Sequence, residues 1–235
     1  MPDHPSPAAA AARDYAALFN PPFVLDPALA ALVVVDMQYA SASRHHGLGA
    51  LLAARGLQAS GSHRFDRIEN IVVPTIQRLL AAFRKRRLPV IFLTVGSELP
   101  DYSDLLPGMR RFAEAIGNRA GAQEHRILDE LAPRPGEAII NKTTMSAFHS
   151  SGFERLVQAL GRTQLCFTGV STNSCVEGTA RDAADRGFQC VIIEDGCGAA
   201  AQELHDATCR NFARLLGRVA TAREVLGELR LDPAA

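Results

Sequence analysis

The sequence predicts an α/β protein, built as a three-layer α/β/α sandwich around a six-stranded, mostly parallel sheet. Two observations support this fold class. Short apolar runs rich in Val and Ile alternate along the chain with longer segments of helical periodicity, and such alternation is typical of a parallel sheet covered by helices on both faces. The chain also has 235 residues, which is enough for one such domain with a large core.

The expected elements follow one another in strand–helix order. Strands buried on both faces are recognised as continuous apolar runs, and these are residues 31–36, 89–95, 137–141, 164–169, 189–195 and, more weakly, 218–220. Helices are recognised by an apolar face, and these are residues 66–87, 152–160, 175–186, 200–215 and 221–229. Two long segments, residues 39–65 and 96–125, are predicted to be irregular lids or binding loops.

Composition limits the domain organisation and the partners. We predict an N-terminal arm at residues 1–27, which is rich in Ala and Pro, and a single domain at residues 28–235. The arm lacks the pattern of a secretory signal, and the five cysteines lack disulfide-framework spacing, which favours the cytoplasm. Because 25 basic residues balance 25 acidic ones, we expect a small-molecule substrate as partner, and neither nucleic acid nor a membrane.

Three reactive side chains follow the carboxyl ends of predicted strands, where parallel α/β sheets bind ligands. Asp36 closes the first strand, Lys142 follows the third and Cys175 follows the fourth. Each has an ordinary explanation, because the aspartate could cap a turn, the lysine could face solvent and the cysteine could pack in the core. Together they form a chemical unit, since a thiol nucleophile needs a base and a nearby cation stabilises both the carboxylate and the thiolate.

The position of Cys175 indicates why a cysteine stands there. Residues 171–174 are polar and a helical pattern begins at Cys175, with Ser174 as the expected N-cap and Gly187 as the stop. Unpaired backbone N–H groups and the positive end of a helix dipole favour the thiolate. We therefore expect this cysteine to react near neutral pH.

Three stretches of the chain resemble the motif blocks of a known family. "VVVDMQ", "NKTTMSAF" and "GVSTNSCVEGTARDAADRGF" resemble, in the same order, the blocks of the cysteine hydrolases of the isochorismatase-like superfamily. The resemblance covers about residues 31–199, and the third block is its most specific part. It implies the Rossmann-like fold of that family, a homodimer or homotetramer, and a catalytic triad of Asp36, Lys142 and Cys175.

The same resemblance implies how the reaction is supported. It places a non-proline cis peptide bond between Val170 and Ser171. It also implies an oxyanion hole made by the backbone N–H groups of Ser171 and Cys175. Two N–H donors aimed at one point stabilise the charge of a tetrahedral intermediate.

Departures from the family's patterns narrow the expected reaction. Isochorismatase itself lacks the nucleophilic cysteine, so Cys175 favours cleavage of a C–N bond. Nicotinamidases carry metal-binding histidines after the second strand, whereas residues 94–108 contain no histidine, and we therefore expect no metal and no other cofactor. The stretch with Asp101 and Asp104 is more similar to the N-carbamoylsarcosine, ureidoacrylate and biuret hydrolases, although Glu98 stands where that branch has a histidine.

The two long loops are expected to select the substrate. The candidate pocket residues are Gln38, Tyr39, His45, His46, Glu98 and Phe148. The two histidines could instead face solvent, and the phenylalanine could instead belong to the core. Arg110 and Arg111 could bind a substrate carboxylate or lie on a solvated helix face. Because the loops offer many polar side chains, we expect a small polar substrate.

The sequence thus predicts a metal-independent cysteine hydrolase that cleaves a C–N bond of a small carboxamide, ureide or N-carbamoyl compound through a thioester intermediate. Among enzymes, the alternative is a hydrolase of another bond, such as a thioester or a lactam. Outside enzymes, the alternative is a non-catalytic binding protein that keeps the fold.

Overall fold

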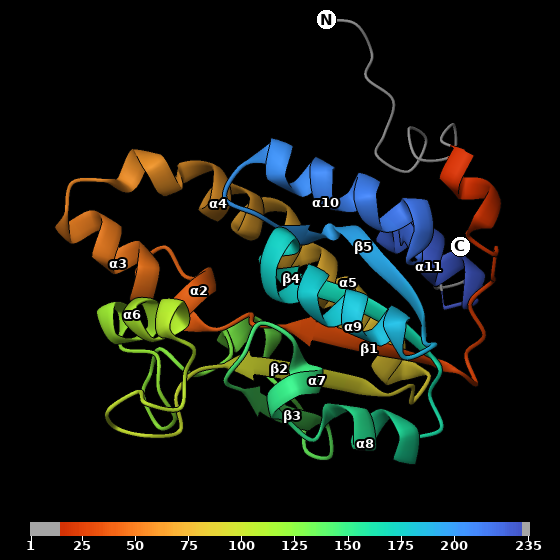
Figure 1. Ribbon diagram of the computed structural model, residues 1–235, viewed down its shortest axis with the longest axis horizontal. Coiled ribbons are helices and arrows are strands. Elements are labelled where there is room, and N and C mark those ends of the chain that lie inside the picture. The colour runs from red at the N-terminus through yellow and green to blue at the C-terminus, as the bar shows by residue number, and fades with distance from the viewer. Residues whose placement is uncertain (1–14, 232–235) are drawn as a thin grey trace, which may run out of the picture.

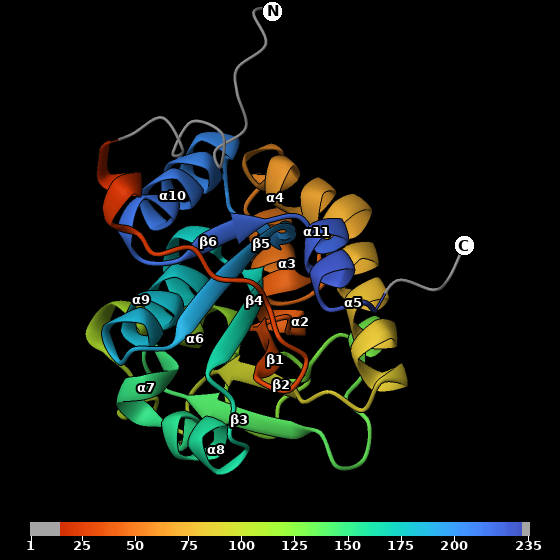
Figure 2. The same cartoon turned by 90° about the vertical axis from the view of Figure 1, so that its right-hand side faces the viewer.

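The computed structural model describes residues 15–231, and at its centre is a sheet of six parallel strands (Figure 1). The strands are β1 (Ala30–Val35), β2 (Val90–Val95), β3 (Ala138–Lys142), β4 (Gln164–Val170), β5 (Gln189–Gly198) and β6 (Arg218–Ala220). Their order across the sheet is β3-β2-β1-β4-β5-β6. Helices cover both faces of this sheet (Figure 2), so the predicted fold class is confirmed.

The helices that connect the strands differ in length and kind. The α-helices are α2 (Tyr39–Ala42), α3 (Gly47–Ala54), α4 (Ser62–Arg67), α5 (Val73–Lys85), α6 (Pro107–Ile116), α7 (Ala147–Ser150), α8 (Phe153–Ala159), α9 (Glu177–Asp185), α10 (Gln202–Leu215) and α11 (Ala222–Glu228). The short 3₁₀ helices are η1 (Tyr15–Phe19), η2 (Gln58–Gly61) and η4 (Asp129–Leu131), and the π-helical turns are η3 (Ile68–Val72) and η5 (Thr172–Val176). The single helix predicted at residues 66–87 is therefore a continuous run of α4, η3 and α5.

Alternation along β1 divides the core between the two faces of the sheet. Leu32 and Val34 belong to the cluster that includes the buried sides of α5 and α11, whereas Val33 and Val35 belong to the cluster formed with α8, α9 and α10. Every residue of β1 is buried, as expected for a central parallel strand. Two cores thus hold the sheet from its faces, and the carboxyl ends of the strands remain for a site.

The two segments predicted to be irregular contain helices. Residues 39–65 include α2, α3 and the start of α4, and residues 96–125 include α6. The α6 helix has Pro107 in its first turn and ends at Gly117, which has a φ of 69°, and both features are common at helix ends. Its apolar residues Met109, Phe112, Ala113 and Ile116 have helical spacing, so the sequence carried a signal for this helix that the prediction of an irregular loop did not use.

The segment before β1 is bound to the domain where the structure describes it. Asn20 Nδ2 donates to the carbonyl oxygens of Ala213 and Gly217 at 3.0 and 2.8 Å, and Gln164 Nε2 donates to that of Val24 at 3.0 Å. The first 14 residues of the predicted arm lie outside the described residues. Within the described range, no helix is long and apolar enough to cross a membrane.

Candidate active site

Three strand ends bring Asp36, Lys142 and Cys175 together. Asp36 follows β1, Lys142 is the last residue of β3, and Cys175 lies in η5, the turn after β4. β1 and β4 are neighbours, and the chain continues from them toward opposite edges of the sheet. Such a point of reversal, at the carboxyl ends of the strands, is where open α/β sheets bind ligands.

Asp36 and Lys142 form a buried ion pair. Lys142 Nζ lies 2.9 Å from Asp36 Oδ2, and only 0% and 2% of the two side chains are exposed. Lys142 reaches across β2 to make this contact. Burial lowers the pKa of Lys142, but its interactions with Asp36 and Cys175, above all with the charge of the Asp36 carboxylate, outweigh burial and leave this pKa raised. The structure therefore replaces the solvent-exposed alternative for this lysine with a buried ammonium group.

The main chain of Asp36 is held by a hydrogen bond, whereas one of its carboxylate oxygens has no hydrogen-bond partner among residues 15–231. Asp36 has a left-handed backbone conformation with a φ of 51°, and Ser41 Oγ donates a hydrogen bond of 2.6 Å to its carbonyl oxygen. Its Oδ1 atom is buried and accepts no hydrogen bond from the described residues. Buried acceptors without a partner are rare in folded proteins, so Oδ1 can accept a proton or a ligand N–H at this site.

The turn that carries Cys175 begins earlier than the sequence predicts. Ser171 occupies the N-cap position of η5, so the prediction of Ser174 as the N-cap is wrong. The hydroxyl of Ser174 instead donates to Met145 Sδ at 2.9 Å. The expected cis peptide bond between Val170 and Ser171 is present.

Gly169 allows this turn to start directly beside Asp36. The glycine pairs with Val35, the last residue of β1, and has a φ of 108°. A Cβ atom at this position would lie 2.0 Å from the carbonyl oxygen of Val35, a contact that no other amino acid could make. The local sequence "FTGVST" thus brings the β4 turn close to the end of β1.

Burial disfavours the thiolate form of Cys175. Burial raises the pKa of Cys175 to about 12; the Asp36 carboxylate also raises it, whereas Lys142 lowers it. The expected thiolate near neutral pH is therefore not supported, because loss of hydration outweighs the helix start and the lysine. Asp36 interacts directly with the thiol, and its Oδ1 accepts no hydrogen bond from the described residues, so this carboxylate is the candidate base for the thiol proton.

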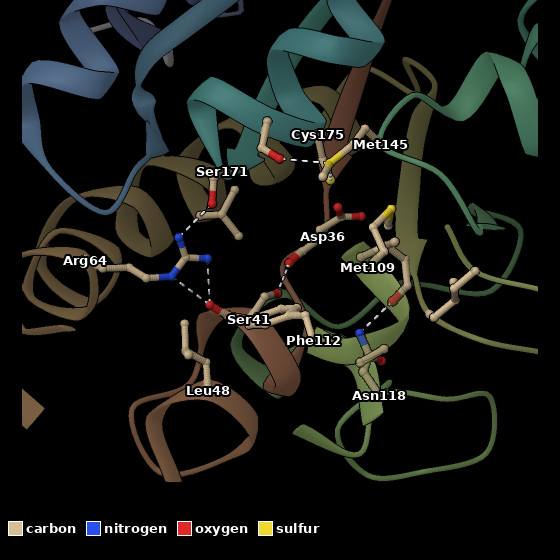
Figure 3. A pocket seen from close by; sticks show the side chains of 16 residues that line it. Asp36, Ser41, Leu48, Arg64, Met109, Phe112, Asn118, Met145, Ser171 and Cys175 are labelled. Carbon is tan, nitrogen blue, oxygen red and sulfur yellow. Dashed lines mark hydrogen bonds between the residues drawn. The ribbon is translucent and has the colours of Figure 1, made fainter. Parts of the chain in front are cut away.

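A cavity of about 280 Å³ opens onto these residues (Figure 3). Asp36, Ser171 and Cys175 are among the residues that line it. Much of the remaining wall is apolar and consists of Leu48, Val95, Leu105, Met109, Phe112, Ala113, Met145 and Val170. The loops were expected to offer polar side chains to a small polar substrate, but α3 and α6 supply mostly apolar side chains to the wall.

The residues proposed after the first strand do not line the cavity. Gln38 is fully buried, and it joins two strand ends because its Oε1 accepts from Val95 N at 2.9 Å. Tyr39 and His46 pack edge to face, with their ring centroids 4.9 Å apart. His45 is exposed to solvent. The structure thus places these four residues outside the cavity wall, and their contact with a substrate stays a prediction.

The other proposed binding residues also lie away from the cavity wall. Glu98 is exposed, and its backbone N–H donates to Asp104 Oδ2 at 2.8 Å. Phe148 is 8% exposed and belongs to the hydrophobic core, as its alternative explanation stated. Arg110 pairs with Glu114 on the surface of α6, and Arg111 is exposed.

The structure adds Arg64, Asn118 and Met145 to the site. All three line the cavity, and Met145 Sδ lies 3.8 Å from Cys175 Sγ. Asn118 Nδ2 donates to Val95 O at 2.7 Å and so holds the loop that follows β2. Met145 stands within the block "NKTTMSAF", and that position was a usable signal. Nothing in the sequence around Arg64 or Asn118 marks either residue.

The described residues contain no evident metal centre. Within residues 15–231, no group of three or more His, Cys, Asp or Glu side chains could hold a metal ion. Metal independence of the reaction stays a prediction.

Comparisons with curated proteins place this geometry in a family. The isochorismatase domain family matches residues 30–224. Ureidoacrylate amidohydrolase RutB of Methylobacterium radiotolerans is 33% identical over 214 residues, which are 84% of this chain and 78% of that protein. The protein of the same name from Agrobacterium fabrum is 30% identical over 222 residues, which are 88% of this chain and 92% of that protein.

Solved structures show the same architecture. A cysteine hydrolase from Pseudomonas syringae pv. phaseolicola superposes with a TM-score of 0.73 at 24% identity, over 89% of this chain and 98% of that one. N-carbamoylsarcosine amidase from Thermoplasma acidophilum superposes with a TM-score of 0.61 at 23% identity, over 83% and 96%. At these identities the structures establish a shared fold, while the family match extends over most of the sequence. The chain belongs to the isochorismatase family.

Proposed function

We propose that this protein is a cysteine hydrolase that cleaves the C–N bond of a small carboxamide, ureide or N-carbamoyl compound. The observation that carries the proposal is that Cys175 and the free Oδ1 of Asp36 meet in one cavity, beside the buried ammonium group of Lys142. Family membership and the similarity to proteins named ureidoacrylate amidohydrolase support the choice of a C–N bond.

The first half of the reaction forms a thioester. Asp36 takes the proton of the Cys175 thiol, and the thiolate attacks the substrate carbonyl carbon. The electrons of the C=O bond move to its oxygen, which the backbone N–H groups of Ser171 and Cys175 would stabilise. When this intermediate collapses, the C–N bond breaks and the leaving nitrogen takes the proton from Asp36. Ammonia or an amine departs, and the acyl group remains on Cys175.

The second half of the reaction hydrolyses the thioester. Asp36, again a carboxylate, takes a proton from a water molecule, and the oxygen of that water attacks the acyl carbon. The C–S bond then breaks, and the departing sulfur recovers the proton from Asp36. Asp36 thus gives up and takes up a proton twice, and in each charged form it forms the buried ion pair with Lys142.

A panel of amides tests this proposal. We expect the purified protein to release ammonia from some primary carboxamides, ureides or N-carbamoyl compounds. Cys175→Ala should lower kcat/KM more than about 1,000-fold, as loss of a covalent nucleophile does. Cys190→Ala is the matched control, because Cys190 lies near the amino end of β5 and its thiol faces the Phe188 carbonyl oxygen.

Two results would contradict the proposal. Full activity of Cys175→Ala would remove the cysteine from the reaction. A protein that cleaves thioesters or lactams but no amide, ureide or N-carbamoyl compound would instead be a hydrolase of another bond.

A further inference from the structure

Arg64 is a buried arginine that lines the candidate active-site cavity (Figure 3). It lies on α4, and only 7% of the residue is exposed. Among the residues that line the cavity, Asp36 and Arg64 alone carry charged side chains. Lys142, the other cation of the site, is paired with Asp36. Arg64 is therefore the cation that the cavity presents to a ligand.

Among the described residues, Arg64 donates hydrogen bonds only to neutral oxygen atoms. Its Nε and Nη2 atoms donate to the carbonyl oxygen of Ser41 at 3.1 and 2.8 Å, and its Nη1 atom donates to Ser171 Oγ at 2.7 Å. A guanidinium has five N–H bonds, so three hydrogen bonds leave two N–H groups over. Within residues 15–231, no carboxylate forms an ion pair with this side chain.

The buried site consequently has an excess of positive charge. Arg64 and Lys142 contribute two positive charges and Asp36 one negative charge, while the resting thiol of Cys175 is neutral. Burial lowers the pKa of the Arg64 guanidinium to about 10, and the opposing charge of the Asp36 carboxylate does not restore it. A buried charge without a counter-ion is costly, and an anion bound beside Arg64 would offset that cost.

We propose that Arg64 binds a carboxylate of the substrate, so that the substrate class is an amide or N-carbamoyl compound that also carries one carboxylate. The free N–H groups of the guanidinium would donate to the carboxylate, a pairing whose geometry suits arginine. The statement that this substrate is an amide or N-carbamoyl compound rests on the proposed function. The statement that Arg64 binds a carboxylate does not depend on it.

The surroundings of Arg64 limit the shape of such a substrate. Because Arg64 contacts the side chain of Ser171, and the backbone N–H of Ser171 is the expected oxyanion donor, the carboxylate must be close to the scissile carbonyl group. A short spacer therefore joins the two groups. The apolar wall formed by Leu48, Met109 and Phe112 suits an apolar spacer or substituent and offers few partners for further charges.

A binding experiment without turnover tests the proposal directly. In the Cys175→Ala background, butanoate and its neutral isostere butanamide are titrated by calorimetry. We expect butanoate to bind at least about 10-fold more tightly, since a hydrogen bond to a charged group contributes that much. Arg64→Gln should abolish the preference, and Arg64→Lys should keep part of it. Arg110→Gln, a change on the outer surface of α6, is the matched control and should leave the preference intact.

Equal binding of the two ligands would overturn the proposal, and so would a preference that survives in folded Arg64→Gln protein. Far-ultraviolet circular dichroism checks that each variant is folded. If Arg64→Gln fails to fold, the Arg64→Lys and Arg110→Gln comparison decides, because only the carboxylate-binding role predicts weaker butanoate binding in the former alone.

Kinetics with a matched pair of substrates distinguishes binding from positioning. Succinamate and succinamide differ by one carboxylate, and we expect Arg64→Gln to lower kcat/KM about 10- to 100-fold more for the former. An equal loss for both would make Arg64 a positioning residue for Ser171 and overturn the proposal. If neither compound is cleaved, the hydrolase assignment is in question, and the butanoate titration still decides the role of Arg64.

Discussion

The end of β3 and the helix α4 each place a buried cation at the same site, and the two cations differ in one respect. Lys142 pairs with a carboxylate at 2.9 Å, whereas Arg64, within residues 15–231, donates hydrogen bonds only to a carbonyl oxygen and a hydroxyl. Burial lowers the pKa of both, yet the pKa of Lys142 ends raised and that of Arg64 falls to about 10. The presence of a paired carboxylate decides whether the pKa of the buried cation is raised or lowered. Lys142 has such a partner within the protein, whereas we propose that Arg64 obtains one from a ligand.

Activity on a neutral primary amide should separate the two cations most strongly. Lys142→Met should lower kcat/KM about 100- to 10,000-fold, because the Asp36–Cys175 pair would lose the charge that supports proton transfer. Arg64→Met should lower it less than about 10-fold, because a neutral substrate offers the guanidinium no carboxylate. Steady-state ammonia release measures both, and similar losses would show that the two cations serve the same step.

The second largest difference between Lys142 and Arg64 is expected in the free energy of unfolding of their variants. Lys142→Met leaves the buried carboxylate of Asp36 without its ion pair, and we expect the free energy of unfolding to fall by about 3–5 kcal/mol. Arg64→Met removes three hydrogen bonds but also an uncompensated buried charge, and its cost should be about 1–2 kcal/mol. Urea unfolding measures both changes.

The double variant Asp36→Asn/Lys142→Met is the control for the stability comparison. It should be more stable than Lys142→Met alone, since it removes the stranded charge. A larger loss for Arg64→Met than for Lys142→Met would contradict the assignment of Lys142 to the ion pair.

Alkylation of Cys175 should show the smallest difference. Because the pKa of Cys175 is raised to about 12, the rate of its reaction with iodoacetamide should rise from pH 7 to 10 without a plateau. Lys142 lowers this pKa, so Lys142→Met should raise it and slow alkylation at pH 8, by about 10-fold for each pKa unit. Arg64→Met should have a weaker effect in the same direction, because the interaction of Arg64 with Cys175 is one of charge alone.

Peptide mapping by mass spectrometry locates the label among the five cysteines. If the alkylation rate of Cys175 reached a plateau near pH 8, its pKa would be low enough for the thiolate that its position at a helix start predicts. Preferential labelling of Cys209 or another cysteine would contradict the exposure of Cys175 to the cavity.

The strands and the positions of Asp36, Lys142 and Cys175 could be predicted because their signals are local. Apolar runs bounded by polar turns mark the strands, and residues that follow such runs must lie at one edge of a parallel sheet. The cis peptide bond at Val170–Ser171 came from the resemblance of the third block. The helices within residues 39–65 and 96–125 were missed, although α6 has apolar residues at helical spacing between Pro107 and Gly117.

The sequence by itself determined the fold, the family and the set of reactive side chains, because each depends on patterns within a few consecutive residues. Only the tertiary structure decided how burial raises the pKa of Cys175 and which residues form the cavity wall. Loss of hydration depends on what packs around a group from the whole chain, and six residues proposed from the loops proved to lie off the wall. Arg64 is the clearest case: "GSHRFD" has no feature of a binding site, and its role arises because α4 packs where Ser41 and Ser171 meet.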